Sequence, residues 1–164
     1  MTNLRQLTLN GCSSLVELPS SIRKMTNLRE LSLDGCSING NMTNLRKISL
    51  DGCSSLVELP SFIGNMINLM ELSFNGCSSL VELLSSIGNV TNLQELYLNE
   101  CSSLVELTSS IENLRKLRKL CLKSCSKLKT FPININMKFP DELDLTDCSW
   151  LKIFPGISTN IRVL

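Results

Sequence analysis

The sequence predicts an α/β-type solenoid, in which about seven short parallel strands line a concave face and irregular or 3-10 segments form the convex face. Three observations predict it. The string CSSLVEL occurs four times, beginning at Cys12, Cys53, Cys77 and Cys101. Seven cysteines in one common frame are separated by 24, 17, 24, 24, 24 and 23 residues. Finally, 43% of the residues are hydrophobic, as in a folded chain, and only 4% are aromatic.

The common frame is L-x-x-L-x-L-x-x-C, as in LRQLTLNGC at 4–12. A period in the twenties with this frame is the signature of leucine-rich repeats. It predicts a single leucine-rich repeat domain over 1–164. The repeats begin near residues 3, 27, 44, 68, 92, 116 and 139, with a partial eighth from 160. No repeat has the polar outer face of a cap, so apolar edges are expected at both ends.

Each repeat is expected to contain one strand with one buried face. In LTL two leucines alternate with a polar residue, a period of two. This pattern points Leu4, Leu7 and Leu9 inward and Gln6 and Thr8 outward.

The convex wall is expected to come from the segment LVELPSSI that follows the cysteine. Leu15, Leu18 and Ile22 would enter the core from this side, and Pro19 favours a 3-10 or irregular path over a long helix. The second repeat is only 17 residues long and lacks this segment, which predicts a kink or cavity near 36–43.

The seven framed cysteines are expected to form a buried structural ladder, because each lies where the chain leaves its strand. A small thiol there can donate weakly to a neighbouring backbone carbonyl. The ladder consists of Cys12, Cys36, Cys53, Cys77, Cys101, Cys125 and Cys148. Disulfides are disfavoured because these side chains would point inward rather than at one another, and because the expected compartment is reducing.

Neither a metal nor another cofactor is expected. The chain contains no histidine, and its closest cysteines, Cys121 and Cys125, have the spacing C-x₃-C rather than the C-x₂-C of zinc sites. Cys121 is predicted to be a tolerated surface thiol on an outward strand position. Without a histidine base, nothing in the sequence would lower its pKa for nucleophilic catalysis.

The composition also limits the partners. Sixteen basic and fifteen acidic residues give a net charge of +1, so neither nucleic acid nor membrane is expected as a partner. Phosphate-binding and dinucleotide-binding glycine motifs are absent, which predicts a protein that is not an enzyme. Without a signal-like or membrane-spanning run, a cytoplasmic location is expected, with the nucleus as the alternative.

The outward strand positions change along the chain. The side chains at these positions are small and similar to one another in the first four repeats, but larger or charged in the last three. The predicted protein-binding residues of the concave face are Tyr97, Asn99, Glu100, Cys121, Lys123, Asp144, Thr146 and Trp150. Tyr97 is the expected anchor, since tyrosine combines a large contact area with a polar tip. Two questions stay open. Trp150 either faces outward or packs on the neighbouring turn, and the basic stretch 115–129 is either a docking surface or a solvated edge.

The composite phrase NLxELxLxxCSSLVELPSSIGNMTNL, followed by CSKLKTFP and CSWLKIFPGISTNIRVL, resembles the repeat region of plant intracellular immune receptors of the TIR-NB-LRR class. The resemblance implies a module that senses pathogen effectors or guarded host proteins. It also implies that the module holds the receptor's own nucleotide-binding domain inactive in a longer chain. The alternative is a stand-alone leucine-rich repeat adaptor for signalling or substrate recruitment.

Overall fold

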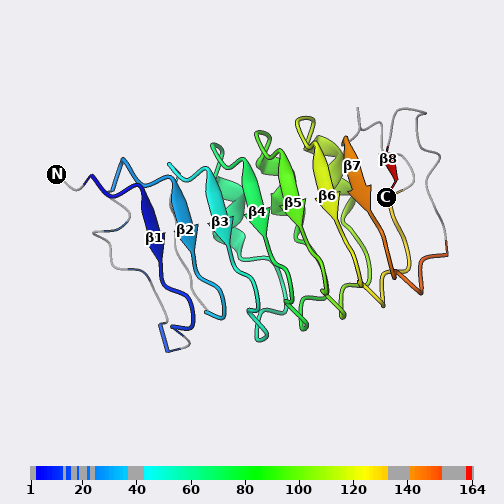
Figure 1. The fold of residues 1–164 in the computed structure, drawn as a ribbon. Coiled ribbons are helices and arrows are strands. Elements are labelled where there is room, and N and C mark those ends of the chain that lie inside the picture. Colours follow the sequence, from blue (N-terminus) through cyan, green and yellow to red (C-terminus); the bar gives the residue numbers. More distant parts are fainter. Residues whose placement is uncertain are drawn as a thin grey trace.

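The computed structural model describes residues 3–12, 14–15, 18, 22, 25–36, 43–132, 141–152 and 162–163. Eight strands form one open parallel sheet in sequence order (Figure 1). Their bounds are Gln6–Thr8 (β1), Glu30–Ser32 (β2), Lys47–Ser49 (β3), Glu71–Ser73 (β4), Glu95–Tyr97 (β5), Lys119–Cys121 (β6), Glu142–Asp144 (β7) and Arg162–Val163 (β8). The predicted solenoid with one strand per repeat is therefore confirmed, and the partial eighth repeat adds β8 to the seven strands expected.

The short second repeat keeps the sheet in register. Glu30 of β2 pairs with Lys47 of β3, and Leu31 pairs with Ile48, although the two cysteines concerned are only 17 residues apart. Most of the segment in which a kink or cavity was predicted, 37–42, lies outside the described residues.

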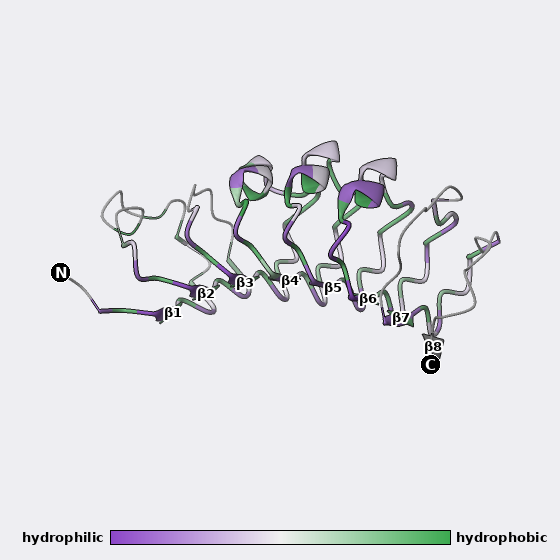
Figure 2. Ribbon diagram, turned by 90° about the horizontal axis from the view of Figure 1, so that it is seen from above, coloured by the Kyte–Doolittle hydropathy of each residue, from purple (hydrophilic) through white to green (hydrophobic). Residues whose placement is uncertain are grey.

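Over the continuously described stretch 43–132, the opposite wall contains three 3-10 helices, Ser61–Asn65 (η1), Ser85–Asn89 (η2) and Ser109–Asn113 (η3). They stack along the side of the solenoid away from the strands (Figure 2). This confirms the predicted 3-10 character of the convex face for these repeats. The residue before η1 is Pro60, whose φ of −58° is the value that its ring imposes. Pro19, on which the prediction was based, lies outside the described residues. In the described part of the chain, no helix is long and apolar enough to cross a membrane.

The core lies between the sheet and the 3-10 wall. The central side chain of each strand from β2 to β7 is at most 2% exposed, as the period-two pattern predicted. Leu4 departs from that prediction, because its side chain is 39% exposed, and Leu7 and Leu9 are only half-buried. The physical reason is that β1 pairs with β2 alone among the described strands, so these leucines pack against one neighbouring repeat.

The 3-10 helices pack so closely that a glycine is needed between them. A methyl group on Gly88 would lie 2.8 Å from the carbonyl oxygen of Ser110 and 2.9 Å from the amide nitrogen of Asn113. We expect Gly88→Ala to lower the free energy of unfolding by about 1–3 kcal/mol, because backbone of η3 must move. Urea unfolding followed by circular dichroism measures this change.

Glu112 supplies the control, since it occupies in η3 the position that Gly88 occupies in η2. Glu112→Ala should change the free energy of unfolding by less than about 0.5 kcal/mol. Equal losses in the two variants would contradict the close approach of the helices.

Candidate functional site

The cysteine ladder is structural. Six thiols donate to a backbone carbonyl of the preceding repeat, over Sγ–O distances of 3.0 to 3.5 Å. These are Cys36, Cys53, Cys77, Cys101, Cys125 and Cys148. The predicted thiol-to-carbonyl donation is thus confirmed for these six. Burial raises the pKa of Cys101 to about 12 and moves the pKa of Cys125 in the same direction, so both thiols stay neutral.

Cys121 is not the surface thiol that the sequence predicted. It does occupy the outward strand position, in register with Tyr97 of β5 and Asp144 of β7. However, Cys121 is only 5% exposed, and it lies between two residues with larger side chains. Burial also raises its pKa, which makes it a weak nucleophile at neutral pH. No three metal-binding side chains gather within the described part of the chain.

A second ladder runs along the concave face. At one strand-end position, a side-chain oxygen accepts a hydrogen bond from the backbone N–H at the same position of the next repeat, over 2.7 to 3.2 Å. The accepting residues are Asn10, Asp34, Asp51, Asn75 and Asn99. Sequence reasoning missed this Asx ladder, although the recurrence of Asn and Asp in one column was the signal.

Serines complete the Asx ladder in the first repeats. Ser32 donates to Asn10, Ser49 to Asp34, and Ser73 to Asp51. The outward polar groups of these repeats therefore bond to one another, and fewer of them are available to a partner.

The Asx ladder ends at Lys123, which has no oxygen acceptor. Its backbone N–H still donates to Asn99 Oδ1 at 3.0 Å, but the N–H of Thr146 donates to Asp144 Oδ1 of its own repeat, at 2.9 Å. Hydrogen bonds from Thr146 hold the pKa of the Asp144 carboxyl below its usual value, with a contribution from the Lys123 charge. Of the predicted binding residues, Asn99 thus also joins two repeats, whereas Asp144 and Thr146 bond to each other within one repeat.

Tyr97 is fixed by its neighbours on the concave face. Its hydroxyl donates to Glu95 Oε2 at 2.6 Å, and Lys119 Nζ lies 5.5 Å from the centroid of its ring. Lys119 in turn pairs with Glu142 Oε1 at 3.0 Å. Burial, followed by the Glu95 hydrogen bond, raises the pKa of Tyr97, so its phenol stays protonated. The ring is therefore held in place before any partner binds.

The turns that follow the strands also change in the last repeats. The first four turns use glycine at φ values between 66° and 74°, at Gly11, Gly35, Gly52 and Gly76. The next three place a side chain in the same left-handed conformation, with φ of 61°, 61° and 60° at Glu100, Ser124 and Asp147. A non-glycine residue pays about 1–2 kcal/mol there. Such strain is typical of positions kept for function.

We expect Glu100→Gly to raise the free energy of unfolding by about 1 kcal/mol, because glycine adopts the left-handed conformation without steric conflict. Chemical denaturation of the parent and the variant measures this gain in the free energy of unfolding. The reverse change, Gly76→Ala, should cost a similar amount, since an added methyl would meet only Gly52 at ordinary contact distances of 3.8 and 3.9 Å. A loss of stability in Glu100→Gly would show that the glutamate makes compensating contacts.

Trp150 lies in the turn after Cys148 rather than on a strand, and its side chain is 52% exposed. Lys129 Nζ from the preceding repeat lies 5.7 Å from the centroid of its ring. The sequence left open whether the Trp150 ring faces outward or packs on the neighbouring turn. The structure shows both features, because the ring is exposed and also contacts Lys129 of the preceding repeat. The register instead brings together Tyr97, Cys121 and Asp144 on adjacent strands.

No family model and no curated protein matches the chain. Among solved structures, a leucine-rich repeat protein of Leptospira interrogans is 31% identical with a TM-score of 0.70, over 88% of this chain and 37% of that one. The leucine-rich repeat domain of the type III effector XopL is 19% identical with a TM-score of 0.51, over 98% of this chain and 75% of that domain. The chain therefore spans little more than a third of the Leptospira protein, and the likeness to XopL concerns the fold alone. The cysteine frame, the parallel sheet with one strand per repeat and these two structures show that the chain is a leucine-rich repeat solenoid.

Proposed function

We propose that this chain is a protein-recognition module without enzymatic activity, and that it binds its partner through the concave face of the repeats containing β5, β6 and β7. The observation that carries this proposal is the fixed Tyr97 ring, held between Glu95 and Lys119 at the point where the serine pattern ends. A preordered aromatic side chain loses little entropy on binding, and such residues dominate the affinity of protein interfaces.

The setting that we propose is the repeat region of a plant TIR-NB-LRR immune receptor, acting in the cytoplasm. The support is the resemblance of the CSSLVELPS repeats and of the closing segment to that family. The partner would be a pathogen effector, a guarded host protein or the receptor's own nucleotide-binding domain. Sequencing the complete transcript tests this setting. TIR and nucleotide-binding sequences ahead of the repeats would support it, whereas a short transcript without them would favour the stand-alone adaptor.

A pull-down from plant leaf extract tests the concave site. The variant is Tyr97→Ala combined with Lys123→Glu, which removes the anchor and inverts the nearby exposed charge. The matched control is Val57→Ala combined with Lys127→Glu, two exposed residues away from the concave strands. Circular dichroism confirms that all three proteins are folded before the comparison.

We expect a partner that is captured by the parent and the control but lost by the Tyr97 variant. Truncating a central aromatic anchor typically costs more than about 2 kcal/mol, or roughly thirtyfold in affinity. A partner retained equally by all three proteins would place the binding surface elsewhere.

A further inference from the structure

Three arginines stack at the edge where the first strands begin. The N–H of Arg29 donates to the carbonyl of Arg5 at 2.8 Å, and the N–H of Arg46 donates to that of Arg29 at 2.7 Å. The three therefore hold the same position in successive repeats, one strand spacing of about 4.8 Å apart. Met70 and Gln94 take this position in the next two repeats. We name Arg5, Arg29 and Arg46 the arginine column.

None of the acidic side chains that the structure describes forms an ion pair with the arginine column. Among the described residues, the ion pairs join Lys47 to Glu71, Arg118 to Asp141, and Lys119 to Glu142. Arg29 donates to the carbonyls of Thr26 and Leu28 at 2.7 and 3.2 Å, while Arg5 and Arg46 make no side-chain hydrogen bond in the described part of the chain. By contrast, Arg118 holds the same position in a later repeat and pairs with Asp141 at 2.8 Å.

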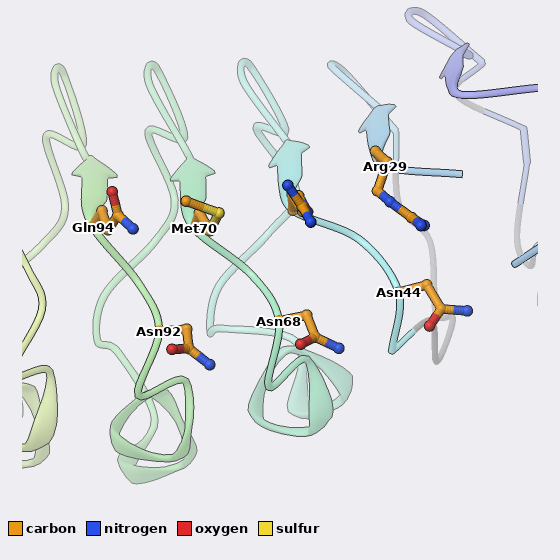
Figure 3. A pocket seen from close by; sticks show the side chains of 7 residues that line it. Arg29, Asn44, Asn68, Met70, Asn92 and Gln94 are labelled. Atoms are coloured by element: carbon orange, nitrogen blue, oxygen red, sulfur yellow. The ribbon is translucent and has the colours of Figure 1, made fainter. Parts of the chain in front are cut away.

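The arginine column lines an open groove. One part, of about 580 Å³, is lined by Asn3, Arg5, Asn27, Arg29 and Arg46. It continues past Arg29 and Arg46 into a second part of about 450 Å³, whose lining includes Asn44, Asn68 and Gln94 (Figure 3).

The walls of this groove are polar and partly fixed. Asn68 and Asn92 donate their amides to the carbonyls of Thr43 and Ile67 in the preceding repeats, at 3.0 and 2.7 Å. A groove with amide walls and three guanidinium groups that form no ion pair with a described carboxylate favours an anionic, hydrogen-bonding ligand over an apolar one.

We propose that the groove binds an extended acidic segment of a partner protein, whose carboxylates pair with Arg5, Arg29 and Arg46. A guanidinium group matches a carboxylate with two parallel hydrogen bonds. The groove crosses successive repeats, so an extended chain laid along it meets the arginines in turn. This site is separate from the Tyr97 surface and goes beyond the function proposed above.

The neighbouring charges favour a peptide over a nucleic acid. Glu30, Glu71 and Glu95 border the same edge of the sheet, in the column next to the arginines. Glu71 is paired with Lys47 at 2.7 Å, but Glu30 forms no ion pair with a described residue. A continuous phosphate backbone would meet these carboxylates, whereas a peptide can place its acids at the arginines and neutral residues elsewhere.

Fluorescence anisotropy with a labelled peptide of alternating Glu and Ser, twelve residues long, tests the proposal. The matched probe replaces every Glu with Gln, and a single-stranded RNA of similar length is a third probe. The variant is Arg5→Gln combined with Arg46→Gln. The control is Arg115→Gln combined with Lys127→Gln, which removes the same charge from exposed positions outside the groove. Circular dichroism checks the fold of each protein.

We expect the acidic peptide to bind the parent and the control, and its affinity to fall about tenfold for each arginine removed in the variant. The neutral probe should not bind. The proposal is overturned if the parent does not bind the acidic peptide, or if variant and control lose affinity equally. It is also overturned if RNA binds through Arg5 and Arg46 as tightly as the peptide does. The variant Tyr97→Ala should bind the acidic peptide like the parent, which separates this site from the concave one.

Discussion

Raising the pH from 8 to 10 should lower the free energy of unfolding by about 4 kcal/mol through Cys101 and Cys125 alone. Both side chains are fully buried, and burial raises the pKa of Cys101 to about 12 and the pKa of Cys125 likewise. In the unfolded chain, thiols ionise near pH 8.5. The unfolded state therefore loses these protons first, and each thiol contributes about 2 kcal/mol over this range.

The direction follows from the raised pKa. The stability contributed by these neutral thiols is fully present below about pH 8.5 and is lost as the pH rises toward the native pKa near 12. Urea unfolding at a series of pH values, with a reductant present to prevent oxidation, measures this dependence.

The variant Cys101→Ser is the control, because serine can still donate to the Phe74 carbonyl, which Cys101 Sγ approaches at 3.1 Å, but does not titrate. The stability of this variant at pH 8 will differ from that of the parent. The two proteins are therefore compared by how steeply the free energy of unfolding falls with pH. Above pH 9, the fall of the free energy of unfolding with pH should be less steep in the variant by about 1.4 kcal/mol per pH unit, which corresponds to one proton fewer released on unfolding. An unchanged slope would show that Cys101 ionises equally in both states.

The repeat frame was enough to predict most of the fold. The alternation of leucines places Leu31 and Ile48 in the core, and the cysteine at the strand exit predicts the donation that Cys36 makes to the Leu9 carbonyl. These features are local and recur in every repeat, so a single sequence shows them several times. The register across the short second repeat also follows, because β2 and β3 carry the same pattern.

What the sequence did not predict depends on the contacts between repeats. Cys121 lies on the outward position, yet it is buried between strands that carry the larger Tyr97 and Asp144, and no pattern within one repeat reports that. The Asx ladder likewise joins residues about 24 positions apart, such as Asn75 and Asn99. The left-handed φ of Glu100 could have been inferred from the glycines in its column, because only a positive φ explains that preference.

The largest single-residue effect on stability is expected at Phe74. Its column contains leucine in the neighbouring repeats, Leu50 and Leu98, and all three side chains are at most 1% exposed. We expect Phe74→Ala to lower the free energy of unfolding by about 3–5 kcal/mol, through lost burial and the cavity left behind. Urea or guanidinium unfolding, followed by circular dichroism, measures this loss.

Two matched variants separate the size of the side chain from its place in the array. Phe74→Leu restores the residue of the neighbouring repeats and should cost only about 1 kcal/mol. Leu9→Ala makes a truncation in the same column of the first repeat, where the side chain is half-buried, and should also cost about 1 kcal/mol. Because each repeat is stabilised by its two neighbours, the same truncation costs more in the centre than at an end. Equal losses for Phe74→Ala and Leu9→Ala would mean that the first repeat is packed as tightly as the centre.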